Sequence, residues 1–108
     1  MASRQETVDF VLDQMAPAGP VSARKMFGEY GIYLDGKMFA LVCDDQLFVK
    51  PTAAGRALLG GTPAEGAPYP GAKPCFLIDG EVLEDRERLS ELARVTAREL
   101  PAPKPRRK

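Results

Sequence analysis

Residue types that commonly carry out acid–base or nucleophilic catalysis are scarce in this chain. It contains no histidine and two cysteines, Cys43 and Cys75. A serine or cysteine nucleophile activated by a histidine base therefore cannot form. The acidic residues lie mostly in expected turns or on the last expected helix, where solvation explains them better than paired-carboxylate catalysis. We therefore expect a protein that is not an enzyme.

The spacing of possible ligands does not favour a metal site either. Zinc sites use about four closely spaced ligands, whereas Cys43 and Cys75 each lie in an apolar stretch. A thiol in such a stretch typically behaves as a small buried hydrophobe. Asp44 and Asp45 lack the repeated oxygen ligands of a calcium-binding loop. We expect neither a metal nor a cofactor.

The glycines give no phosphate-binding loop. Gly28 and Gly31 follow one expected strand and lead into another, without the helix N-terminus that would receive a phosphate. Gly60 and Gly61 follow a helix rather than opening one. Backbone bends explain these glycines more simply, with Gly28 and Gly31 marking a bulge or a close approach of chains.

The N-terminal residues argue against export and membrane insertion. Glu6, Asp9 and Asp13 interrupt any apolar block of the kind that a secretory signal needs. The sequence also contains no run of about 18 apolar residues, the length that a membrane span requires. We therefore expect a cytoplasmic protein without membrane contact. A reducing cytoplasm would keep both thiols free, although a disulfide between neighbouring strands stays an open alternative.

Charge is balanced overall but unevenly distributed. Fifteen basic residues match fifteen acidic ones, and four of the basic residues, Lys104, Arg106, Arg107 and Lys108, fall in the last five positions. Without these four, eleven basic residues face fifteen acidic ones, a formal charge of −4. The body of the chain therefore lacks the cluster of positive charge that phosphate-backbone binding requires.

The first expected element is an amphipathic helix. Ser3 and Glu6 have the spacing of a capping box at a helix start. The apolar residues that follow recur at helical spacing, and Pro17 ends the helix. Phe10 lies off this apolar stripe, where it could cover a sheet edge or a partner. The stripe consists of Val8, Val11, Leu12 and Met15.

Strands separated by tight turns follow. Asp35-Gly36 is a dipeptide suited to a two-residue hairpin, because both positions tolerate a positive φ. Residues 38–43 are continuously apolar, which indicates a central strand covered on both faces. The four expected antiparallel strands span residues 22–27, 30–34, 37–43 and 46–50.

The second half of the chain returns to helices. Thr52 is expected to cap a short helix, and a loop over Gly60–Lys73 is rich in Gly and Pro. A fifth strand over residues 74–78 reaches a turn at Asp79-Gly80, and a final helix spans about residues 85–99. We therefore predict an α+β domain over residues 1–100, with a five-stranded antiparallel sheet in the order α-β-β-β-β-α-β-α. Residues 101–108 are expected to form a disordered basic tail.

One segment resembles a known family. Residues 24–33 read R-K-M-F-G-E-Y-G-I-Y, and the similarity continues through residues 35–41 and 47–50. This pattern resembles the N-terminal domain of the TfoX/Sxy family and covers most of the chain. The matching residues, which we treat as family-motif and candidate interaction residues, are Arg24, Lys25, Met26, Phe27, Gly28, Gly31, Phe39 and Lys50.

The resemblance carries expectations about fold and role. It implies a five-stranded antiparallel sheet with flanking helices, similar to the secretion-chaperone-like fold. Full-length members are implied to regulate competence for DNA uptake, acting with the cAMP receptor protein at promoters. They carry a second, C-terminal domain, and we expect this chain to be a single-domain member without it. The family supplies no catalytic residues to transfer.

Three functional hypotheses follow. The leading one is a regulatory or protein-interaction domain with a protein partner. The second is weak nucleic-acid binding through Arg24, Lys25 and the basic tail. The third is a small-molecule or enzymatic site beneath the loop over residues 60–73. A homodimer formed through a strand edge or through Phe10 is compatible with each hypothesis.

Overall fold

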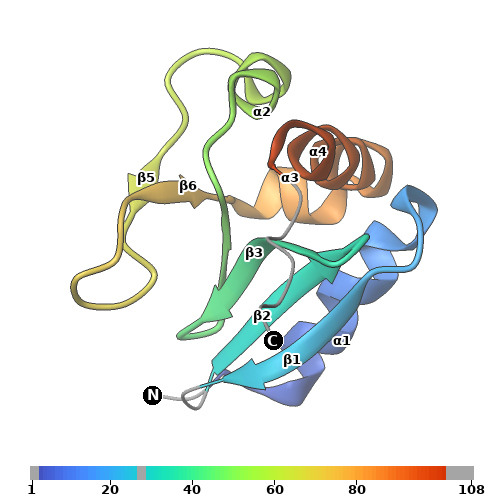
Figure 1. Ribbon diagram of the computed structural model, residues 1–108, viewed down its shortest axis with the longest axis vertical. Coiled ribbons are helices and arrows are strands. Elements are labelled where there is room, and N and C mark those ends of the chain that lie inside the picture. Colours follow the sequence, from blue (N-terminus) through green and yellow to red (C-terminus); the bar gives the residue numbers. More distant parts are fainter. Residues whose placement is uncertain (1–2, 27–28, 102–108) are drawn as a thin grey trace, which may run out of the picture.

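The computed structural model describes residues 3–26 and 29–101, which form one antiparallel sheet with helices against it (Figure 1). In this part of the chain the sheet has six strands in the order β1-β2-β3-β4-β6-β5. The strands are β1 (Ser22–Met26), β2 (Glu29–Leu34), β3 (Lys37–Cys43), β4 (Gln46–Val49), β5 (Glu65–Gly66) and β6 (Cys75–Leu77). The helices are α1 (Gln5–Met15), α2 (Ala53–Leu59), α3 (Gly80–Glu84) and α4 (Arg86–Glu99), with a 3₁₀ turn, η1 (Ala16–Ala18), after α1. The predicted α+β class is confirmed.

Two local features differ from the prediction. A sixth strand, β5, lies inside the expected loop, where Glu65 pairs with Phe76 and Gly66 with Cys75. A strand of two residues is too short to produce an alternating pattern that the sequence could reveal. The expected turn at Asp79 is instead the start of helix α3, because its side chain accepts a hydrogen bond from the Val82 amide at 3.1 Å.

Both two-residue turns of the meander use left-handed backbone. Asp35 and Gly36 have φ values of 55° and 76°, which confirms the predicted hairpin. Asp44 and Asp45, between β3 and β4, have φ values of 53° and 60° although neither is a glycine. Left-handed backbone is less costly for Asp than for most residues with a side chain.

A β-bulge explains why residues 38–43 are apolar without interruption. Ile32 pairs with Ala40 but Tyr33 pairs with Met38, so Phe39 is an extra residue on β3. Phe39 and Ala40 consequently both join the core beneath the helices. The predicted central strand is confirmed, because β3 lies between β2 and β4 and is buried from Phe39 to Cys43.

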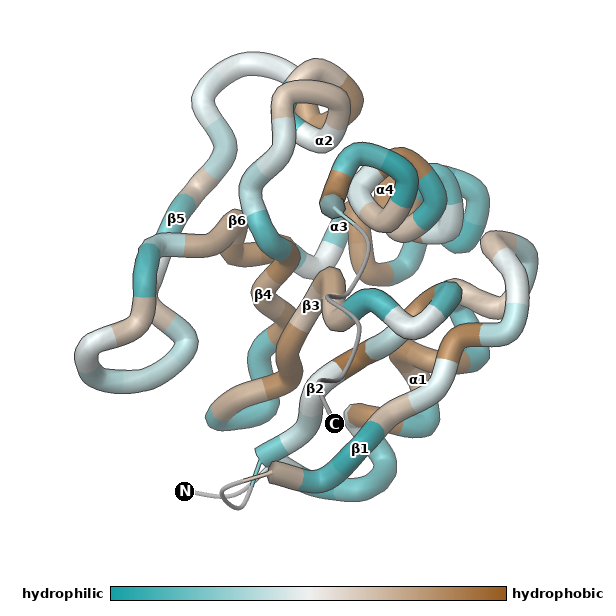
Figure 2. Tube along the Cα trace, in the orientation of Figure 1, coloured by the Kyte–Doolittle hydropathy of each residue, from teal (hydrophilic) through white to brown (hydrophobic). Residues whose placement is uncertain are grey.

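Helices α1 and α4 cover one face of the sheet and enclose the main core (Figures 1 and 2). Three residues of the predicted apolar stripe of α1 are buried there and Leu12 packs against them partly buried, whereas Phe10 is 44% exposed. Burial of each large side chain stabilises the fold by roughly 1.5–3 kcal/mol. Core members include Val8, Val11, Met15, Ile32, Phe39, Val49, Leu89 and Leu92.

The start of α1 does not form the predicted capping box. Arg4 occupies the N-cap position and its side chain makes no capping hydrogen bond. The hydroxyl of Ser3 instead donates to Oε1 of Glu29 at 2.6 Å. Oδ1 of Asp45 accepts a hydrogen bond from the Arg4 amide at 2.8 Å. A carboxylate from the β3–β4 turn therefore holds the helix start, in place of a neighbour in sequence.

Long-range contacts also fix the later helices. Thr52 Oγ1 accepts a hydrogen bond from the Gly55 amide at 2.9 Å, which confirms the predicted cap. The carboxylate of Glu99 accepts hydrogen bonds from the Ala53 and Ala54 amides, so the end of α4 is tied to the start of α2. None of the helices in the described ranges combines the length and apolarity needed to cross a bilayer.

Candidate interaction surface

The pairing register places one row of residues across the sheet on the side away from α1 and α4. Directly opposed residues on neighbouring strands point to the same face. We call this surface the open face. The row consists of Arg24, Gly31, Leu41, Phe48 and Leu77, each paired with the next.

The centre of the open face is a second, smaller apolar cluster. Leu41, Cys43, Phe48 and Cys75 are buried there, separate from the main core. The loop between β5 and β6, yellow in Figure 1, projects from the sheet on the side away from α1. It carries Tyr69, whose surface is 54% exposed. A large aromatic that is exposed beside an apolar cluster is typical of a binding surface.

Two hollows lie on the open face and meet at Leu41 and Tyr69. The first, the Cys43 hollow, has a volume of about 420 Å³ and also involves Met26 and Glu29. The second, the Lys50 hollow, has a volume of about 400 Å³. Its other lining residues include Met38, Lys73 and Cys75.

Burial keeps both thiols of the open face protonated. It raises the pKa of the Cys43 thiol to about 11, and the negative charge of Glu29 adds to this effect. Burial also raises the pKa of Cys75, partly offset by the positive charge of Lys50. Thiols with raised pKa values are poor nucleophiles. Both cysteines are free, and β4 lies between their strands, so the alternative of a disulfide between neighbouring strands is wrong.

Glu29 brings a fixed negative charge to the Cys43 hollow. Burial alone would raise its pKa, but hydrogen bonds from Ser3 and the Asp44 amide outweigh burial and hold the pKa below its ordinary value. Oε2 of Glu29 accepts from the Asp44 amide at 3.0 Å. The carboxylate is therefore ionised and already engaged by the protein itself.

Several residues of the family motif lie on or beside the open face. Met26 lines the Cys43 hollow and Lys50 the Lys50 hollow. Gly31 permits a close approach, because a Cβ there would lie 2.8 Å from the Met38 sulfur and 2.9 Å from that of Met26. The hypothesis that Gly31 marks a close approach fits this geometry. Phe39, by contrast, is fully buried in the main core.

The remaining motif residues do not form one basic patch. Arg24 lies on the open face with its guanidinium 5.2 Å from the centre of the Tyr33 ring. Lys25 pairs with Tyr30 and points to the opposite face of β1. Phe27, Gly28 and the basic tail from residue 102 lie outside the described residues. Nucleic-acid binding through Arg24, Lys25 and the tail stays a prediction.

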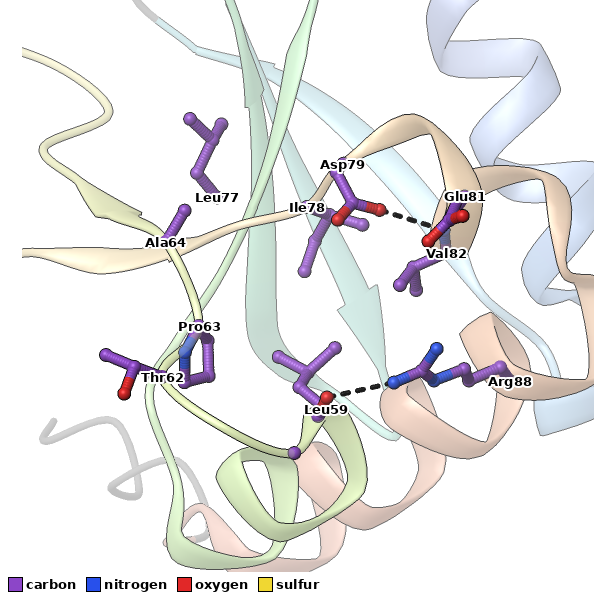
Figure 3. A pocket seen from close by; sticks show the side chains of 11 residues that line it. Leu59, Thr62, Pro63, Ala64, Leu77, Ile78, Asp79, Glu81, Val82 and Arg88 are labelled. Atoms are coloured by element: carbon purple, nitrogen blue, oxygen red, sulfur yellow. Dashed lines mark hydrogen bonds between the residues drawn. The ribbon is translucent and has the colours of Figure 1, made fainter.

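A third hollow lies beneath the first part of the loop over residues 60–73 (Figure 3). Its volume is about 390 Å³, and Arg88 and Asp79 project from opposite sides of it. Arg88 donates to the carbonyl oxygen of Leu59 at 2.9 Å. Asp79 is occupied in capping α3. Because Arg88 and Asp79 already have internal partners, the hollow offers Glu81 as its remaining charged side chain, which favours a structural role over a small-molecule site.

Sequence reasoning missed Tyr69 and Lys73 as parts of the surface, because both lie in a loop without periodicity. Glu29 was expected near an interaction surface that includes Arg24 or Lys25, and it lines the Cys43 hollow. In the described ranges, no three His, Cys, Asp or Glu side chains are placed to hold a metal ion.

Together these features define a small α+β domain whose sheet has one face covered by helices and one face that carries two adjoining hollows. A family model for the TfoX N-terminal domain matches residues 13–100. The chain is 45% identical to an uncharacterized 12.7 kDa protein in the trpE 5′ region of Spirochaeta aurantia, over 99% of this chain and 91% of that protein. The chain belongs to the TfoX N-terminal domain family.

Proposed function

We propose that this TfoX N-terminal domain is a cytoplasmic, non-enzymatic regulatory domain that binds a protein partner through its open face. The observation that carries the proposal is the placement of Arg24, Met26, Gly31 and Lys50. These four motif residues lie on or beside one apolar surface that no helix of the described residues covers. A surface of this kind is better suited to association than to catalysis.

The thiols and the carboxylate on the open face support the proposal that the domain is not an enzyme. Its two thiols have raised pKa values, which disfavour the reactive thiolate. Its carboxylate, Glu29, is held by hydrogen bonds rather than directed at a free site. The TfoX/Sxy proteins that the chain resembles are regulators of competence. The contact is therefore proposed to serve transcription-associated regulation in a bacterial cell.

Two exposed aromatics give a matched test. Tyr69 stands beside the open face and Phe10 on α1, and their surfaces are 54% and 44% exposed. Tagged chains carrying Tyr69→Asp or Phe10→Asp would be purified from the native host and the stoichiometry of any co-purifying protein measured. Circular dichroism would confirm that each variant is folded.

The proposal expects a stoichiometric partner for the unmodified chain and for Phe10→Asp, and its loss for Tyr69→Asp. Retention of the partner by Tyr69→Asp, or its loss for Phe10→Asp alone, would move the contact away from the open face. Recovery of no partner under several growth conditions would count against an interaction domain.

A further inference from the structure

The Lys50 hollow continues, on the side away from the Cys43 hollow, into another hollow that is separate from the one beneath the loop over residues 60–73. This end hollow has a volume of about 310 Å³ and shares Met38, Lys50 and Leu100 with the Lys50 hollow. The Lys50 hollow in turn shares Leu41 and Tyr69 with the Cys43 hollow. Three joined hollows make an elongated groove, whereas a small-molecule site is typically one concave pocket that encloses its ligand.

The two ends of this groove carry opposite charges. Glu29 lies at the Cys43 end, and its charge is satisfied by Ser3 and the Asp44 amide. Lys50 and Lys73 line the middle hollow, and Lys50 also lines the end hollow. No carboxylate of the described residues comes within ion-pair distance of either lysine. The positive end is therefore available to a ligand, while the negative end is engaged.

Other cations nearby are less available. Lys37 lines the end hollow, but its ammonium donates a hydrogen bond to the Ala97 carbonyl at 2.8 Å. Lys50, by contrast, lies close enough to Cys75 for its charge to lower the pKa of that thiol. Lys50 also lines the same hollow as Leu41 and Cys75. A ligand carboxylate could meet Lys50 while apolar groups contact Met38 and Tyr69, which line the same hollow.

Building on the proposed function, we propose that the groove binds an extended peptide segment of the partner. The segment presents apolar side chains to Leu41, Met38 and Tyr69, and an acidic side chain to Lys50 and Lys73. A row of three joined hollows suits an extended chain better than a compact ligand. Alternate side chains of such a segment point the same way and can fill successive hollows.

The test is a direct binding measurement with a defined probe. A fluorescein-labelled peptide of about nine residues spans roughly 30 Å when extended. One probe alternates Leu and Ser and ends in two Asp residues, and its matched control ends in two Asn residues. Fluorescence anisotropy would compare the unmodified chain with Lys50→Gln/Lys73→Gln and with Lys25→Gln. Lys25 is an exposed lysine on β1 that lines none of the three hollows.

We expect the acidic probe to bind the unmodified chain and Lys25→Gln alike. Binding to Lys50→Gln/Lys73→Gln should be about three- to tenfold weaker, since exposed ion pairs contribute modestly. Salt should reduce the difference between the acidic and Asn probes. Equal binding of the two probes, no binding of either, or binding that the double substitution leaves unchanged would overturn the inference. Displacement of the acidic probe by a single-stranded oligonucleotide would assign the lysines to nucleic acid and also overturn it.

Failure of this inference is distinguishable from failure of the proposed function. If the native partner is lost with Tyr69→Asp but retained at full stoichiometry by Lys50→Gln/Lys73→Gln, the open face still binds a protein. The acidic segment is then wrong while the interaction surface stands. Absence of any partner would instead remove the proposed function.

Discussion

The Ser3 hydroxyl oxygen lies 2.6 Å from Oε1 of Glu29 and donates a hydrogen bond to it. The same hydroxyl accepts a hydrogen bond from the Asp45 amide at 3.0 Å. Ser3 therefore connects the start of α1 to the start of β2 and to the turn between β3 and β4. Because Glu29 also lines the Cys43 hollow, this junction positions one end of the open face.

Replacement of Ser3 by alanine should destabilise the domain by about 1–2 kcal/mol, since it removes the hydroxyl that donates to the half-buried Glu29 carboxylate and accepts from the Asp45 amide. Ser3 is only 7% exposed, so water would not readily replace the hydroxyl. The measurement is the free energy of unfolding from urea denaturation. Ser22→Ala, at an exposed position on β1, serves as the control and should change stability little. Equal effects of the two substitutions would contradict this role of Ser3.

Protonation of the Glu29 carboxylate in acid should lower the stability of the folded protein. Its pKa in the folded protein lies below the ordinary value of 4.5. The ionised form is therefore favoured by folding, and its contribution is fully present above the unfolded pKa. That contribution is lost as the pH falls below about 4.5 and through the lower folded pKa. Unfolding free energy measured against pH should decline less steeply in this range for Glu29→Gln. Identical slopes would show that Glu29 does not contribute.

Substitution by glycine should raise the stability of the protein at Asp44 and lower it at Asp45. Asp44 has a positive φ, and no hydrogen bond to its carboxylate is found among the described residues, so Asp44→Gly should stabilise by up to about 1 kcal/mol. Asp45→Gly relieves the same kind of backbone strain but removes the oxygens that accept hydrogen bonds from the Arg4 amide and the Thr7 hydroxyl. It should therefore destabilise the protein. Thermal unfolding of the two variants side by side checks the difference, and a lower melting temperature for Asp44→Gly than for Asp45→Gly would refute it.

Gly31→Ala should destabilise the domain by roughly 1–3 kcal/mol because it overpacks the open face. The new methyl would meet the sulfur atoms of Met38 and Met26, which must then move. Gly80→Ala is the matched control, since a Cβ there meets nothing within 4 Å. Chemical denaturation of both variants measures the effect. A neutral Gly31→Ala would mean that the methionines relocate without cost.

Local rules explain which parts of the fold were predictable. The Asp35-Gly36 hairpin and the apolar stripe of α1 depend on neighbours in sequence, and both were predicted correctly. The capping box was wrong because Ser3 is bound by Glu29, 26 residues along the chain, and by Asp45. Strand β5 exists only through its pairing with β6, which no local pattern encodes.

The candidate surface was less predictable than the fold. The motif segment pointed to Met26, Gly31 and Lys50, but residue spacing alone did not show that they share one face. The bulge at Phe39 shifts the alternation of β3, so register had to be known before the face could be assigned. Tyr69 and Lys73 join the surface through the folding of a loop whose sequence has no period.

Site-specific cross-linking in living cells would show whether the open face is the binding surface. A photoreactive phenylalanine analogue would be introduced at Tyr69 or, in a separate chain, at Phe10. We predict one dominant protein adduct from position 69, reduced when Leu77 on the same face is replaced by Asp, and little or none from position 10. A dominant adduct from position 10, with none from position 69, would contradict it.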